Sequence, residues 1–188
     1  MKYELTDMVL ETEGGLVLHR IRALRDIPER GVAAGDSGGW VESEANLSQD
    51  GDSWVSGDAY VYGDACVSGN ARVSGYARVY GDARVSGYAC VYGDARVSGD
   101  ARVSDDARLP SRNSIFMASH VGTENGTLTV TSGVSGLVVT RGCFTGSVDE
   151  FLEKSRTVHD DKTHNEYRML IEVAKSRIPV HAVPDTED

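Results

Sequence analysis

The chain carries one hydrophobic pattern that repeats every six residues through its middle. Each unit places a small residue two positions before an aliphatic one, as Ala77 stands before Val79, and a glycine two positions after it, as at Gly81. Residues two apart point to the same side of a strand, so the small and aliphatic side chains share one interior. The aliphatic positions are Val55, Val61, Val67, Val73, Val79, Val85, Val91, Val97, Val103 and Leu109.

A period of six residues is too short for a helical repeat and fits one short strand followed by one corner. Glycine adopts positive φ at little cost, so it is expected at the corner, where Asp105 replaces it in the last turn. Three units close a triangular turn of about 18 residues, and the turns stack as parallel strands. The pattern predicts a mainly β fold with a short parallel β-helix over residues 39–109. An earlier register at Val41 and Leu47 joins it after a two-residue insertion in the SQDGD segment.

The repeat resembles the hexapeptide repeat of left-handed β-helices, the fold of many acyltransferases. The aliphatic residue and the small residue four positions later match that pattern, as in Val79 and Ala83, but the glycine is displaced by one position. The resemblance implies a left-handed coil and a homotrimer. Acyltransferases of this fold need a base, usually histidine, and its carbonic anhydrase relatives bind zinc through histidines. No histidine stands between Val55 and Leu109, so an acyltransferase is disfavoured and no catalytic residue, metal or cofactor is assigned.

Stacking of the turns arranges the outward residues in columns. Tyr62 lies over Tyr80, and exposed tyrosines on a flat face favour an interface between subunits. The charged columns are interpreted as a solvated surface on which opposite charges offset one another. A ligand or metal groove lined by stacked carboxylates is the alternative. These columns contain Asp64, Asp82 and Asp100, beside Cys66, Arg84 and Arg102.

The two flanks of the repeat have ordinary strand and helix patterns. Residues 1–38 predict a β-hairpin cap with a turn at Gly14 and Gly15, followed by Trp40 as a plug for the open end of the coil. Residues 110–178 predict an α+β domain of three strands and two helices. The strands are SIFMASHVG, GTLTVTSG and GLVVTRGCF, and the helices begin at capping boxes of Ser147 with Glu150 and of Thr163 with Glu166. Residues 179–188 are expected to be a flexible tail.

Composition excludes several classes of protein. The net charge is −10 and no block of lysine and arginine occurs, which disfavours binding to a nucleic acid polymer. The three cysteines, Cys66, Cys90 and Cys143, form no disulfide pattern and indicate a reducing compartment. The N-terminus does not have the pattern of a signal peptide, and no apolar run is long enough to cross a membrane. A cytoplasmic protein without membrane contact is expected.

The blocks GGWVESEANLSQ and RGCFTGSVDEF, together with the repeats between them, resemble an uncharacterised family of phage and prophage proteins. The resemblance covers nearly the whole chain. It implies an accessory protein in the cytoplasm of the host cell. A small anionic, nucleotide-like ligand, such as an immune signal of the host that the protein sequesters, is consistent with this setting. A scaffold or inhibitor that binds a host protein through the faces of the coil is the alternative.

Arginine recognises phosphate and carboxylate through its planar fork of donors, and Arg112 and Arg141 are the only cations between residues 110 and 146. Docking of the last domain onto Asp105 and Asp106 is the structural alternative for these arginines. Two further alternatives are a nucleophilic cysteine with a histidine, and a metal bound between the helices by His159, His164 and the intervening aspartates. The predicted ligand site, between subunits of the trimer, comprises Arg112, Asn113, Ser114, Arg141, Cys143 and His159.

Overall fold

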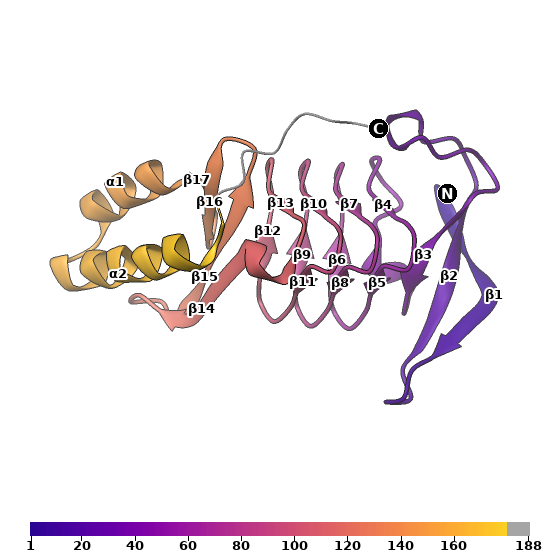
Figure 1. Cartoon of the computed structure of the whole chain (residues 1–188), viewed down its shortest axis with the longest axis horizontal. Helices are drawn as coiled ribbons and strands as arrows, with labels where there is room; N and C mark the ends of the chain where they lie inside the picture. Colours follow the sequence, from indigo (N-terminus) through magenta and orange to yellow (C-terminus); the bar gives the residue numbers. More distant parts are fainter. Residues whose placement is uncertain (180–188) are drawn as a thin grey trace.

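A parallel β-solenoid forms the centre of the molecule, with a β-hairpin at one end and a sheet with two helices at the other (Figure 1). The computed structural model describes residues 1–179, so the tail expected over 179–188 lies outside the described residues apart from Pro179. The predicted mainly β architecture is confirmed. The solenoid strands are β4 (Trp54–Val55), β5 (Tyr60–Val61), β6 (Cys66–Val67), β7 (Arg72–Val73), β8 (Arg78–Val79), β9 (Arg84–Val85), β10 (Cys90–Val91), β11 (Arg96–Val97), β12 (Arg102–Val103) and β13 (Arg108–Leu109).

These strands stack in parallel, and each turn advances by 18 residues, as predicted. Val61 of β5 pairs with Val79 of β8, which pairs with Val97 of β11. The aliphatic residues and the small residues before them are buried and form one continuous core along the coil. Full burial of one valine stabilises the fold by about 1.5 kcal/mol or more. The handedness of the coil stays a prediction from the hexapeptide pattern.

The corners need glycine for two separate reasons. Gly81 has a φ of 70°, in the left-handed region that disfavours other residues. A Cβ at Gly81 would also stand 3.0 Å from the backbone nitrogen of Gly99 in the next turn. Asp105 occupies the same place in the last turn with a φ of 55°. No further corner of the coil stacks on Asp105. Its side chain therefore has the cost of positive φ but does not clash with the backbone of a following turn.

The first turn of the coil contains two extra residues. Val41 pairs with Val61 and Leu47 bridges to Val67, a spacing of 20 residues in place of 18. This register confirms the predicted insertion between Leu47 and Val55. The first turn contains β3 (Ser37–Val41) and the short helix η2 (Glu44–Asn46), which directly precedes the bridge of Leu47 to Val67.

The N-terminal hairpin continues one face of the coil. β1 (Tyr3–Glu11) pairs with β2 (Val17–Ala23), and β2 pairs antiparallel with β3, which lies parallel to β5. The resulting sheet has the order β1-β2-β3-β5-β8-β11. The short helix η1 (Pro28–Arg30) lies in the segment between β2 and β3. The predicted hairpin is therefore joined to the coil through continuous strand pairing.

The prediction that Trp40 plugs the coil is wrong. Val41 points into the core, so its neighbour Trp40 points outward, where the Arg20 guanidinium lies 5.0 Å from the ring centre. Tyr3 closes this end instead and is fully buried; burial raises the pKa of its phenol to about 12. Lys2 is buried beside it, and burial lowers the pKa of its ammonium group to about 8.

The C-terminal sheet has four strands, one more than predicted. Its order is β14 (Ile115–Val121), β15 (Gly126–Gly133), β16 (Gly136–Arg141) and β17 (Phe144–Ser147), all antiparallel. The GCF segment was predicted to end the third strand, but Gly142 adopts a φ of 59° and turns the chain back into β17. The short helix η3 (Arg112–Ser114) precedes β14. The sheet covers the end of the coil, where Ala107 bridges to Gly133.

Two helices follow, as predicted. Ser147 and Glu150 form the expected capping box at the start of α1 (Val148–Val158). The second capping box is not formed: α2 (Asp161–Arg177) begins earlier, because the Asp160 carboxylate accepts a hydrogen bond of 2.8 Å from the Thr163 backbone. Within residues 1–179 no helix is long and apolar enough to span a membrane.

Candidate functional site

Three of the six predicted site residues line one cavity in the C-terminal region. Arg141 ends β16, Cys143 lies in the turn between β16 and β17, and His159 caps the C-terminus of α1. The cavity has a volume of about 140 Å³ and is also lined by Tyr167 of α2. Antiparallel pairing and the return of α1 along the sheet bring these positions together.

The guanidinium group of Arg141 is largely buried, with the side chain 11 % exposed. Its Nη2 donates to the carbonyl oxygen of Val121 at 3.2 Å, and Nη1 lies 3.9 Å from a carboxylate oxygen of Glu124. Its Nε is buried and has no hydrogen-bond partner among the described residues. A Cβ at Gly126 would overlap the guanidinium. The β14–β15 turn therefore depends on glycine to admit the arginine, which keeps donor capacity unused.

Aromatic side chains make up the rest of the wall. The ring of Phe151 lies 5.4 Å from Phe144 and 5.2 Å from Tyr167, and the His159 ring lies 5.5 Å from Tyr167. Lys154 of α1 places its ammonium group 5.2 Å from the centre of the Phe144 ring. The cavity combines an apolar wall with Arg141, Lys154 and His159, and its one described acidic group, Glu124, is mostly exposed, an arrangement suited to a small anionic group.

The other three predicted residues lie outside this cavity. Arg112, Asn113 and Ser114 form η3, between the last turn of the coil and β14. The Arg112 guanidinium pairs with the Asp94 carboxylate at 3.3 Å, and Ser114 is buried with its hydroxyl beside that of Ser111. The structure therefore separates the predicted site into a cavity and a connection between coil and sheet.

The alternative in which Arg112 and Arg141 dock onto Asp105 and Asp106 does not match the ion pairs. Arg112 pairs with Asp94, and Arg141 lies near Glu124. The docking contacts are hydrogen bonds instead. Arg102 of the coil donates through its backbone to the Thr129 hydroxyl at 3.3 Å and through Nη1 to the Gly142 carbonyl at 2.9 Å. The second bond connects the coil to the turn that carries Cys143.

The geometry does not support the two chemical alternatives. Cys143 is exposed in its turn, and among residues 1–179 no hydrogen bond joins it to His159. In the same part of the chain, no group of histidine, cysteine or acidic side chains is arranged to hold a metal ion. Hydrogen bonds from Thr163 lower the pKa of Asp160, consistent with its capping role at α2.

The second predicted surface, the tyrosine face, consists of the outward side chains of β3, β5, β8 and β11 and of the residues directly after these strands, including Tyr62 and Tyr80. Tyr62 and Tyr80 stack with ring centres 5.1 Å apart and planes 4° from parallel. Burial raises the pKa of the Tyr62 phenol. The Arg78 guanidinium lies 5.3 Å from the centre of the Tyr60 ring. The outward residues of successive turns therefore lie in columns, with Tyr62 over Tyr80 and Tyr60 over Arg78, as the repeat predicted.

The predicted site did not include Lys154, Tyr167 or Glu124, which also line the cavity. Lys154 follows Phe151 by three positions on α1, so helical spacing already places it on the side of the buried residues. Tyr167 was predicted on the inner side of α2, but its approach to His159 depends on how α1 and α2 pack. Glu124 lies in a turn and carries no local signal for its position near Arg141.

Comparison with known protein families identifies the repeat of the coil and gives no match for the flanks. Residues 65–79, 77–93, 89–105 and 95–109 match the family described as YdcK Beta solenoid repeat. These segments span less than half of the chain. A comparison with curated proteins returned no match. The repeat match and the observed coil together show a β-solenoid repeat protein.

Proposed function

We propose that the protein is a non-enzymatic binding protein that holds the anionic group of a small ligand in the C-terminal cavity. The observation that carries this proposal is the Arg141 guanidinium, which is largely buried and lines one cavity with His159 and Lys154. Guanidinium groups bind phosphate and carboxylate through paired, charge-assisted hydrogen bonds.

The size of the cavity limits what it holds. Pockets for drug-sized ligands have volumes of about 300–1,000 Å³, whereas this cavity has about 140 Å³. It accommodates one phosphate or carboxylate group with little else, so the remainder of a nucleotide extends beyond the rim. The proposed ligand is nucleotide-like, and a second subunit covers its outer part. Sequestration of a host immune signal is the role that the resemblance to phage proteins supports.

Binding is expected to raise the thermal stability of the whole protein. Ligand at one hundred times its Kd stabilises the folded state by about 2.7 kcal/mol. A panel of mononucleotides, cyclic nucleotides and ADP-ribose is screened by differential scanning fluorimetry, and a positive compound is titrated by calorimetry. Lys154→Gln and His159→Gln are expected to weaken its binding about tenfold each, since each removes one charge-assisted contact.

Lys162→Gln is the matched control, because Lys162 is exposed on α2 and does not line the cavity. It is expected to bind like the unmodified protein. The proposal fails if the panel gives no stabilisation, or if the three variants bind equally well. Turnover of the bound compound would instead support a transferase or hydrolase, with Cys143→Ala as its test.

The tyrosine face supports a second proposal, a homotrimer that packs through this surface. The stacked pair Tyr62 and Tyr80, with Trp40 and Tyr60 on the same face, provides aromatic area of the kind that anchors protein interfaces. The β1–β2 hairpin extends this sheet and borders a hollow of about 480 Å³ beside Tyr60 and Tyr62. A host protein that binds the same face is the alternative occupant.

Light scattering after size exclusion is expected to give a mass about three times the 20.2 kDa of the chain. The double variant Tyr62→Glu and Tyr80→Glu is expected to be monomeric, because paired carboxylates cannot be buried without partners. Tyr76→Glu is the control, since Tyr76 lies at a corner and is 72 % exposed. A monomeric unmodified protein contradicts the trimer and leaves the face free for another protein.

A further inference from the structure

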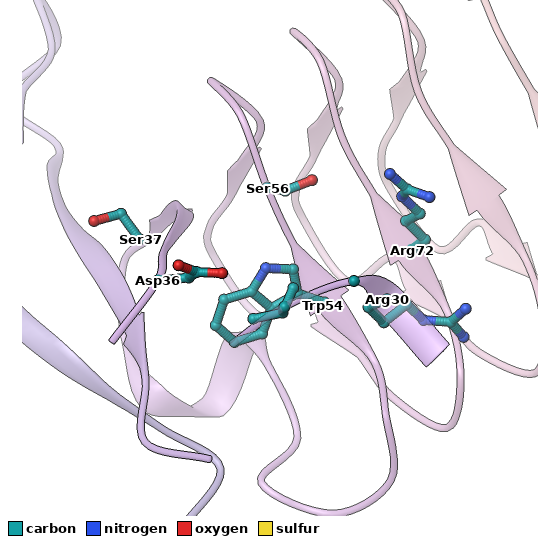
Figure 2. A pocket seen from close by; sticks show the side chains of 8 residues that line it. Arg30, Asp36, Ser37, Trp54, Ser56 and Arg72 are labelled. Atoms are coloured by element: carbon teal, nitrogen blue, oxygen red, sulfur yellow. The ribbon is translucent and has the colours of Figure 1, made fainter. Parts of the chain in front are cut away.

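A second cavity lies at the opposite end of the coil, where the segment before β3 crosses the outer side of β4 and β7 (Figure 2). Arg30 holds this segment in place: its Nε donates to the Asp52 carbonyl at 3.1 Å, and its Nη2 donates to the Asn70 carbonyl. The cavity has a volume of about 290 Å³. This volume is about twice that of the C-terminal cavity, and none of the residues lining the two is shared.

The centre of this cavity is the indole of Trp54, which is 2 % exposed. Its Nε1 forms no hydrogen bond with another residue of the range 1–179, although the side chain is almost fully buried. Buried tryptophan normally pairs its N–H with an acceptor. Figure 2 shows the nitrogen edge of the ring on the side where Ser56 lies.

The remaining polar groups are mostly donors. Arg72 follows Trp54 in the strand ladder, is exposed, and its guanidinium forms no ion pair with another described residue. The hydroxyls of Ser56 and Ser37 also line the cavity. Among the described residues that line the cavity, the one acidic residue is Asp36. It lies on the other side of the indole from Arg72 (Figure 2) and accepts a hydrogen bond of 2.8 Å from the Ala33 backbone.

We infer that this cavity binds a small molecule through a carboxylate or phosphate group seated between the Arg72 guanidinium and the Trp54 N–H. An oxyanion provides the acceptor that the indole lacks and the countercharge that the guanidinium lacks. The Asp36 carboxylate repels a second negative charge, so the other end of the ligand is neutral or cationic. The inference does not depend on the function proposed for the C-terminal cavity, because the two sites use different residues.

The chain contains two tryptophans, Trp40 and Trp54, so its indole N–H groups give two signals in a nitrogen–proton NMR spectrum. Phosphate, acetate and glycine are titrated separately into the full-length protein, with sodium chloride at equal ionic strength as the control. The Trp54 signal, assigned with Trp54→Phe, is expected to shift and saturate, whereas the Trp40 signal stays in place. Comparison of phosphate with acetate identifies the preferred oxyanion, and glycine tests the role of Asp36.

Arg72→Gln is expected to weaken binding of the preferred probe at least about tenfold, which corresponds to the loss of one charge-assisted contact. Arg84→Gln is the matched control, because Arg84 occupies the equivalent outward position on another face of the coil, outside the cavity. His159→Gln, which tests the C-terminal cavity, leaves this titration unchanged. The inference is overturned if no probe moves the Trp54 signal beyond the sodium chloride control, or if Arg72→Gln binds as tightly as the unmodified protein.

Discussion

Replacing Gly93 with alanine is expected to lower the free energy of unfolding by about 3 kcal/mol, whereas the same change at Gly99 costs about 1 kcal/mol. Both glycines turn a corner of the coil with positive φ, at 63° and 57°. An alanine at either position therefore pays the same left-handed strain. At Gly93 the new Cβ also overlaps the carbonyl oxygen of Pro110, which is backbone and cannot move aside. At Gly99 the nearest atom is the flexible end of Met117, at 3.7 Å.

The measurement is urea denaturation monitored by circular dichroism. The shift in the urea midpoint is converted into a change in the free energy of unfolding with one m-value for all variants. Gly99→Ala is the control for strain alone. Equal losses at the two positions would mean that stacking of backbone on backbone does not restrict the corners, and that positive φ is the whole reason for glycine. Asp105, with its φ of 55°, already shows that the strain alone is tolerated where no corner stacks above.

Asn46→Ala is expected to destabilise the protein by about 2–3 kcal/mol, because the buried Asn46 amide completes the backbone hydrogen bonding of the first turn. Asn46 is fully buried, and its oxygen accepts from the backbone nitrogen of Ser43 at 2.8 Å. Its Nδ2 donates to the carbonyl oxygens of Gly63 at 2.8 Å and Ala65 at 2.9 Å. In later turns such carbonyls accept from backbone N–H groups of the preceding turn, as Ala77 does from Tyr60.

Removal of this amide leaves the buried carbonyl of Ala65 without a partner, at about 1–3 kcal/mol, and also removes the partly buried bonds to Ser43 and Gly63. Asn70→Ala is the control, since Asn70 is half-buried in the regular repeat and bonds its neighbours through its backbone. The control is expected to change stability by less than about 1 kcal/mol. A loss of that size for Asn46→Ala would mean that water or a local rearrangement replaces the amide.

The cavities of interest form at the junctions between the coil and its flanks. The cavity at Trp54 lies between the coil and the segment before β3, and the hollow beside Tyr60 lies between the coil and the β1–β2 hairpin. The C-terminal cavity lies beside the turn that the Arg102 side chain of the coil contacts. A flat repeating face presents no concavity of its own, so binding sites arise where an irregular segment crosses it or continues from it.

Much of the coil follows directly from its period. The spacing of Val61, Val79 and Val97 is set by six-residue units, and it predicts the turn length, the core and the stacked tyrosines. Of the two capping boxes that the sequence indicated, Ser147 with Glu150 formed, whereas Thr163 with Glu166 did not, because α2 begins earlier at Asp160. These features are local or strictly repeated, so the position of each residue can be predicted from its neighbours in the sequence.

The binding site depends on contacts that no local pattern encodes. Arg141 and His159 meet because β17 turns back and α1 lies along the sheet, whereas Arg112 pairs with Asp94 of the coil. The outward direction of Trp40, by contrast, already follows from alternation beside the inward Val41. The positions of the arginine and histidine side chains are set by the packing of the flanks against the coil. Such long-range contacts depend on the shapes of several elements at once and not on spacing along the chain.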